Sequence, residues 1–192
     1  MKSSYLFIVL FFSSLCSVYA QDTALDVMKK GAEHPREKGF THYIGEEFEG
    51  GVVYYLTKGE DGIEHGLIVS KTEKTHTKWQ DKNSFVKAND SEDGAVNTKL
   101  MVHSPAKKYV TSLGEGWYLP SIDELSHLYH FRAEVSETLS SGGFTPLSET
   151  AIYWSSTEFV AQSAFAFDFD GGYSGDHSYK FQPYVVRGVK AF

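Results

Sequence analysis

The mature part of this chain is expected to contain no cysteine. The only cysteine among the 192 residues is Cys16. It lies in an N-terminal segment, residues 1–20, in which Lys2 precedes an apolar run and small residues lead to Ala20. That order is typical of a secretory signal peptide with cleavage after Ala20. An exported chain without disulfides must be held together by its hydrophobic core.

Long hydrophobic runs and an excess of positive charge are absent as well. The apolar run Tyr5–Phe12 is short beside the roughly 20 residues of a membrane-spanning helix, so no transmembrane segment is expected after signal cleavage. A lipid on Cys16 is not expected, because Leu15 directly precedes it. The formal net charge is −7, and it falls by one more when Lys2 is lost with the signal peptide. This acidity argues against nucleic acid or anionic lipid as a partner.

The sequence contains no recognisable catalytic or metal motif. Its eight histidines show no H-x-x-x-H or H-E-x-x-H spacing, and Ser155-Ser156 lacks the G-x-S-x-G setting of a hydrolase nucleophile. Asp168, Asp170 and Asp176 offer carboxylates to a hard cation such as calcium, but their spacing is not that of an EF-hand. We therefore predict a protein that is not an enzyme and holds no cofactor or metal, with these three aspartates as weak metal candidates.

The globular part is expected to begin near residue 43, after a short helix around residues 24–30 and a linker that completes residues 21–42. β-Rich composition or alternation predicts strands over residues 50–56, 66–70, 151–157, 164–170 and 184–192. Helix signals predict short helices at residues 94–102 and 105–110. Polar, aperiodic composition predicts loops at residues 72–93, 136–150 and 158–163 and a turn at 170–183.

The stretch GWYLPSIDELSHLY, residues 116–129, places two acidic residues and a histidine close together. Glu124 follows Ser121 by three positions, which is the S-x-x-E pattern of a capping box. Asp123 adds negative charge at the positive end of the helix dipole. An acid/base centre with His127 is the alternative, but capping accounts for both acidic groups. We therefore predict a strand-to-helix junction, with His127 solvated on the helix surface.

The same stretch, followed by YWSSTE and the terminal VVRGVKAF, resembles the DUF1566 family, which includes the C-terminal domain of a collagen-like adhesin from Legionella. The upstream motifs YIGEEFEGGVVYYL, EHGLIVS and GAVNT are similar to that family's opening hairpin and first helix, so the resemblance covers residues 43–192. It implies an α+β, C-type-lectin-like fold with twisted antiparallel sheets, two or three short helices and long loops. It also implies an exported protein, often at bacterial surfaces, and some members bind glycans as adhesins. The Gly-X-Y repeat of the collagen-like adhesin is absent, which removes the usual basis for a trimer.

The predicted loops carry the residues that we single out as a binding surface. Flat rings beside amide and other polar groups suit a sugar, which has apolar faces and polar edges. In the fold that the resemblance implies, long loops form the binding face. The candidates are Trp79, Asn83, Asn89, Tyr173, His177 and Tyr179. The alternative for Trp79 is a plug of the core beneath the long loop.

The sequence therefore predicts an exported, non-catalytic domain at the bacterial cell surface, with glycan as the leading ligand class. The alternative is a structural or protein-interaction subunit of a surface assembly. Periplasmic, cell-surface and secreted locations all remain open. A local group of lysines would admit a sulfated polyanion despite the acidic net charge: Lys71, Lys74, Lys78, Lys82 and Lys87.

Overall fold

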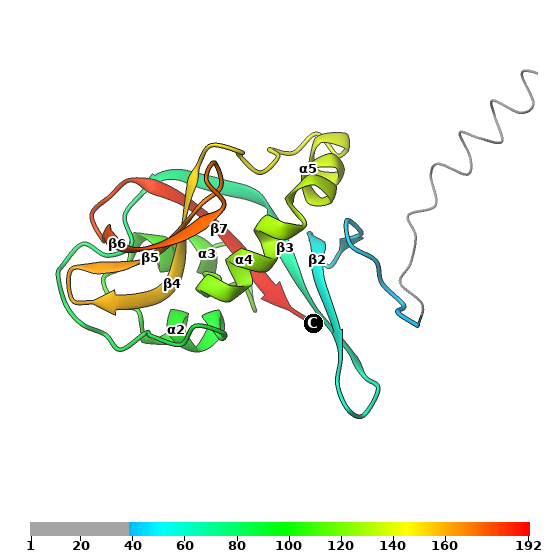
Figure 1. Ribbon diagram of the computed structural model, residues 1–192, viewed down its shortest axis with the longest axis horizontal. Coiled ribbons are helices and arrows are strands. Elements are labelled where there is room, and N and C mark those ends of the chain that lie inside the picture. The colour runs from blue at the N-terminus through cyan, green and yellow to red at the C-terminus, as the bar shows by residue number, and fades with distance from the viewer. Residues whose placement is uncertain (1–38) are drawn as a thin grey trace, which may run out of the picture. The chain divides into compact units, whose positions relative to one another are not determined.

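One seven-stranded sheet organises residues 39–192, the part of the chain that this computed structural model describes (Figure 1). The predicted signal peptide and residues 21–38 lie outside the described residues, as do the side chains of Asp176 and His177. The strands lie in the order β1-β2-β3-β7-β4-β5-β6. Their bounds are Glu47–Phe48 (β1), Gly51–Lys58 (β2), Glu64–Thr77 (β3), Ile152–Val160 (β4), Ser163–Asp168 (β5), Tyr173–Tyr179 (β6) and Tyr184–Ala191 (β7).

Most neighbouring strands in this sheet are antiparallel. β4 and β7 are the parallel pair and meet at Tyr153 and Val185, and the other neighbouring pairs run antiparallel. β2 and β3 form a hairpin that extends beyond the rest of the sheet (Figure 1). β7 lies between β3 and β4, so it joins the β1–β3 half of the sheet to the β4–β6 half.

The two faces of the sheet are covered by different elements, because side chains of a strand alternate between its faces. The helices of the described residues are Gly94–Leu100 (α2), Pro105–Thr111 (α3), Ile122–His130 (α4) and Arg132–Ser141 (α5). α4 and α5 supply Leu125 and Leu139 to a core that also contains Phe167 of β5. The next residue towards the N-terminus, Ala166, belongs to a second core with Val110 of α3. The domain therefore has a core on each face of one sheet.

The structure confirms the α+β class, the mostly antiparallel sheet and the predicted junction before α4. Ser121 is the N-cap of α4, and its hydroxyl accepts a hydrogen bond from the Glu124 N–H. The Glu124 carboxylate accepts one in return from the Ser121 N–H at 2.7 Å. This reciprocal pair is the capping box that the sequence pattern predicted. The helix over 105–111 is confirmed too, with Ser104 as its cap and Pro105 in its first turn.

Three predicted element boundaries are wrong for identifiable reasons. β3 continues through Thr77, because its polar second half pairs with β7 instead of forming a loop. Helix α5 occupies residues 136–141 of the loop predicted over 136–150. Its N-cap residue, Phe131, makes no side-chain cap hydrogen bond, so no start signal marked the helix. β6 occupies the middle of the predicted turn at 170–183 as a polar edge strand. The number of helices also differs, because the described residues contain four helices and the resemblance implied two or three.

Candidate functional site

A long loop, residues 78–93, is fixed to the sheet by a buried ion pair. Glu158 of β4 and Lys180, which follows β6, have fully buried side chains and form a salt bridge. The Glu158 carboxylate also accepts hydrogen bonds from the backbone N–H groups of Val86 at 2.8 Å and Lys87 at 2.7 Å. The buried carboxylate therefore holds the middle of the loop against the end of β4.

Trp79 lies beneath this loop, and its position corrects the expectation that it contacts a ligand. The ring is fully buried, and its Nε1 donates a hydrogen bond to the Ser155 carbonyl at 2.8 Å. The Lys180 Nζ lies 4.5 Å from the ring centroid and donates to the Ser84 carbonyl at 2.9 Å. The faces of the ring are covered by protein, so Trp79 is the core plug that the alternative described.

The other predicted binding residues are only partly brought together. Asn83 and Asn89 are exposed on the loop, and Tyr179 at the end of β6 is 63% exposed. Tyr173 is 60% exposed but begins the same strand, about 20 Å from Tyr179 at the usual rise of a strand. The side chain of His177 is outside the description. The loop and Tyr179 therefore form the candidate surface, and Tyr173 lies apart from it.

Aromatic side chains that the sequence reading did not single out extend this surface. Phe85 on the loop, Phe159 of β4 and Phe181 beyond β6 are each more than two-fifths exposed. Phe159 follows the buried Glu158 directly, and Phe181 follows the buried Lys180. Strand alternation could have marked Phe159, because in β4 the residue after a buried one faces the opposite way. We define the loop surface as Asn83, Phe85, Asn89, Phe159, Tyr179 and Phe181.

The lysine group is divided by the extended β3. Lys71 and Lys74 belong to this strand, and Lys71 forms an exposed salt bridge with Glu47. Lys78, Lys82 and Lys87 are the exposed lysines of the loop itself. The loop of residues 78–93 therefore carries three of the five predicted cations.

Of the three weak metal candidates, Asp168 has a structural role in a turn. The Asp168 Oδ1 accepts hydrogen bonds from the backbone N–H groups of Asp170 at 2.9 Å and Gly171 at 3.3 Å, which closes the turn before β6. Asp170 is exposed, and the side chain of Asp176 is not described. Among the residues whose placement the structure gives, no three His, Cys, Asp or Glu side chains are grouped as metal ligands.

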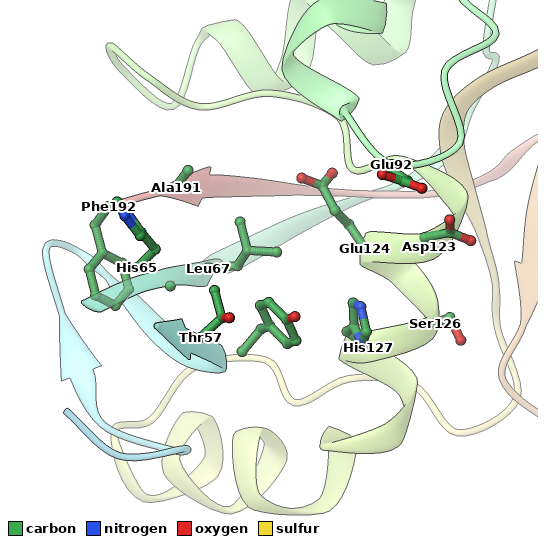
Figure 2. A pocket seen from close by; sticks show the side chains of 12 residues that line it. Thr57, His65, Leu67, Glu92, Asp123, Glu124, Ser126, His127, Ala191 and Phe192 are labelled. Carbon is green, nitrogen blue, oxygen red and sulfur yellow. The ribbon is translucent and has the colours of Figure 1, made fainter. Parts of the chain in front are cut away.

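A second candidate region is a cavity of about 610 Å³ between α4, the β2–β3 hairpin and the end of β7. Figure 2 shows Glu92, Asp123 and Glu124 at one end of it and His65, Ala191 and Phe192 at the other. We call this cavity the acidic pocket. Its residues come from segments far apart in the chain, so no sequence motif marked it as a site.

The floor of the acidic pocket corrects the expectation for His127. The His127 ring is half-buried and stacks on Tyr55, with ring centroids 4.3 Å apart and an interplanar angle of 26°. Burial is the main reason that the pKa of His127 is lowered from its usual value, although Asp123 opposes this shift. His127 is therefore largely neutral at pH 7 and contributes no full positive charge to the pocket.

Glu124 also lines the acidic pocket, but most of its side chain is buried. Its side chain receives hydrogen bonds from the Tyr118 hydroxyl at 2.8 Å and from the Ser121 N–H at 2.7 Å. Burial is the main cause that raises the pKa of Glu124 to about 7, with Asp93 adding to it, while these hydrogen bonds oppose the shift. Both carboxylate oxygens are engaged by protein donors, which fits a capping role better than that of a free general base.

The structure is that of a small α+β domain built on one mostly antiparallel sheet. A long loop, residues 78–93, is anchored against one face of this sheet. The chain belongs to the family of the Lcl C-terminal domain, whose family model matches residues 69–190. This is the family, equivalent to DUF1566, that the sequence motifs resembled. A search of curated proteins finds no match to this chain.

A crystal structure of a fimbrial protein from Bacteroides ovatus has a similar fold. The TM-score is 0.59 at 16% sequence identity, and the match covers 74% of this chain and 44% of that protein. The chain therefore corresponds to less than half of the fimbrial protein, and at this identity the likeness concerns the fold alone. Within residues 39–192, no helix is both long and apolar enough to cross a membrane.

Proposed function

We propose that this chain is an exported, non-catalytic binding domain that acts at the bacterial cell surface, with glycan as its ligand class. Membership of the Lcl C-terminal domain family supports this proposal. The observation that carries it is the loop surface, which combines exposed amides on the loop held by the Glu158–Lys180 pair with exposed rings on this loop, on β4 and at the end of β6. The signal peptide at residues 1–20 is part of the proposal.

The loop surface suits a sugar because of how its two kinds of side chain are combined. An exposed ring such as Tyr179 offers an apolar face and a hydroxyl, and Asn83 and Asn89 offer both a donor and an acceptor. The anchored loop does not have to be ordered when a ligand binds, which lowers the entropic cost of binding. A shallow site of this kind is expected to bind with a dissociation constant of about 1 mM.

A protein-interaction subunit of a surface assembly is the second candidate. The structural neighbour described above is a fimbrial protein. Phe85, Phe159 and Phe181 are apolar throughout, and exposed aromatic rings of this kind are typical of protein interfaces. β6 is also an edge strand of the sheet, and edge strands can pair with another chain.

Titration of the mature protein with neutral glycans and with a sulfated polysaccharide, at two salt concentrations, tests the proposal. We expect Tyr179→Ala to abolish binding of the neutral glycan and Tyr173→Ala, a matched change of an equally exposed tyrosine at the far end of β6, to leave it intact. Salt-sensitive binding that depends on Lys78, Lys82 and Lys87 would assign a polyanion instead. No binding of either class at millimolar concentration would reject glycan and favour the protein partner.

A further inference from the structure

The acidic pocket has the size and the lining of a binding site separate from the loop surface. Its volume of about 610 Å³ lies within the range of roughly 300–1,000 Å³ that small-molecule pockets occupy. The loop surface belongs to the β4–β6 half of the sheet, whereas the pocket lies against β2, β3 and the end of β7. The pocket takes Glu92 from the loop of residues 78–93, but none of the residues of the loop surface lines it.

One end of the pocket is negative without any cation of its own. Glu92, Asp123 and Glu124 lie at this end (Figure 2), and no lysine or arginine is among the lining residues. Glu92 and Asp123 are exposed. Because the imidazole of His127 is largely neutral, it does not balance these charges. The field at this end therefore favours a positive group.

The rest of the pocket is mainly apolar, although Thr57, His65 and Ser126 also line it. The stacked rings of Tyr55 and His127 form its floor, and Leu67, Ala191 and Phe192 complete the apolar lining. Phe192 is itself fixed, because its N–H donates to the Gly66 carbonyl at 3.0 Å and its ring packs against the Phe48 ring with centroids 4.8 Å apart. A guest with an apolar stem and a charged end would match both parts of this lining.

A buried tyrosine hydroxyl, that of Tyr54, lies near Glu124, one of the acidic residues of the pocket. β2 carries an irregularity between Val53 and Tyr55, and both Tyr54 and Tyr55 pack on the α4 side of the sheet. The Tyr54 hydroxyl is fully buried and has no hydrogen-bond partner in the part of the chain that the structure describes. It lies within electrostatic range of Glu124 and Tyr118. Tyr54 is not among the residues that line the pocket, so its hydroxyl adds to the polar surroundings of Glu124 without meeting a guest.

We infer that the acidic pocket binds a primary ammonium or guanidinium group on an apolar stem, as the lysine and arginine side chains of a partner polypeptide present it. The stem lies along Tyr55, Leu67 and Phe192, and the cation meets the carboxylates of Glu92 and Asp123. The domain thus has a site for a basic polypeptide segment besides its loop surface. This inference does not depend on glycan binding at that surface.

The test is a titration followed by the backbone amide resonances of the mature protein. The probes are a blocked tripeptide with lysine at its centre, one with arginine, and one with norleucine, which keeps the stem and lacks the charge. We expect the first two to shift the resonances of Tyr55, Leu67 and His127, with a dissociation constant of about 1 mM. Raising the salt concentration from 0.05 to 0.5 M should weaken this binding several-fold.

The variant Glu92→Gln with Asp123→Asn should weaken binding of the lysine probe about tenfold, because two nearby charges are lost. Glu137→Gln with Glu149→Gln is the matched control, since it removes two exposed carboxylates that do not line the pocket. Equal binding of norleucine, or no loss in the first variant, would overturn the inference. Equal affinity for n-butylammonium would keep the cation site and overturn its assignment to a polypeptide. Unchanged glycan binding in the first variant would separate the two sites.

Discussion

Glu158 and Glu124 are the two buried carboxylates of the described residues, and they are buried in opposite ways. Glu158 faces a buried cation, Lys180, whose pKa is lowered by burial while the salt bridge opposes that shift. Glu124 has only neutral donors around it, and burial raises its pKa to about 7. The carboxylate of Glu158, which is paired with a cation, thus anchors a loop. The carboxylate of Glu124, which has only neutral partners, titrates near pH 7.

The largest effect is expected from breaking the paired carboxylate. Lys180→Met leaves Glu158 buried without its cation and should lower the free energy of unfolding by about 3–5 kcal/mol. Urea denaturation measures this change, and amide exchange of Val86 and Lys87 reports whether the loop is released. In the control, Lys180→Met with Glu158→Gln, the buried charge is gone and an acceptor is kept, so part of the stability should return. A loss below about 1 kcal/mol in the single variant would show that the pair does not hold the loop.

An intermediate effect on the free energy of unfolding is expected from Glu124, the buried carboxylate with neutral partners. Because the pKa of Glu124 is raised from 4.5 to about 7, its contribution to stability is full below pH 4.5 and is lost as the pH rises through 7. The loss amounts to about 3 kcal/mol, at about 1.4 kcal/mol for each pH unit.

Glu124→Gln isolates this contribution, because glutamine can keep the capping box while it cannot ionise. Unfolding free energies of the two proteins from pH 4 to 8 should show a steeper fall for the wild type across that window. Parallel curves would mean that Glu124 titrates near its usual value. His127, whose pKa is lowered, acts in the opposite direction in both proteins and cancels in the difference.

The smallest effect is expected at the unpaired hydroxyl beside Glu124. Tyr54→Phe removes an atom that has no hydrogen-bond partner among the described residues, so stability should be unchanged or should rise by up to about 1 kcal/mol. Tyr118→Phe is the matched change, since it removes a hydroxyl that donates to Glu124, and it should cost about 1–3 kcal/mol. Thermal unfolding of both variants measures the contrast. Equal losses would place a partner on the Tyr54 hydroxyl.

The sequence predicted what depends on local signals. The capping box at Ser121 and Glu124 and the proline-started helix at Pro105 need only neighbouring residues, and both are confirmed. The family motifs predicted the α+β class. α5 was missed because Phe131 gives its N-terminus no polar cap, and β6 was missed because an edge strand needs no apolar alternation.

The burial of Trp79 and the acidic pocket could not be predicted from the sequence, because both depend on residues that are far apart in the chain. Burial of Trp79 depends on Ser155 and Lys180, which lie far along the chain, so composition alone could not choose between ligand contact and core. The acidic pocket joins Tyr55, Glu92, His127 and Phe192 only after folding. The sequence reading explained Asp123 and Glu124 by capping, which is confirmed for Glu124, but it could not show that both also line a cavity.

The position of β7 in the sheet has a consequence for how this domain reaches its folded state. β7 pairs Ala191 with Leu67 of β3, and it also pairs with β4, so residues 184–191 complete both halves of the sheet. Contacts that span more than a hundred residues raise the contact order, and folding slows as contact order rises. The chain cannot complete its sheet until these residues have been synthesised. Slow and late folding of this kind suits the export that we propose, because a chain must remain unfolded while it is translocated.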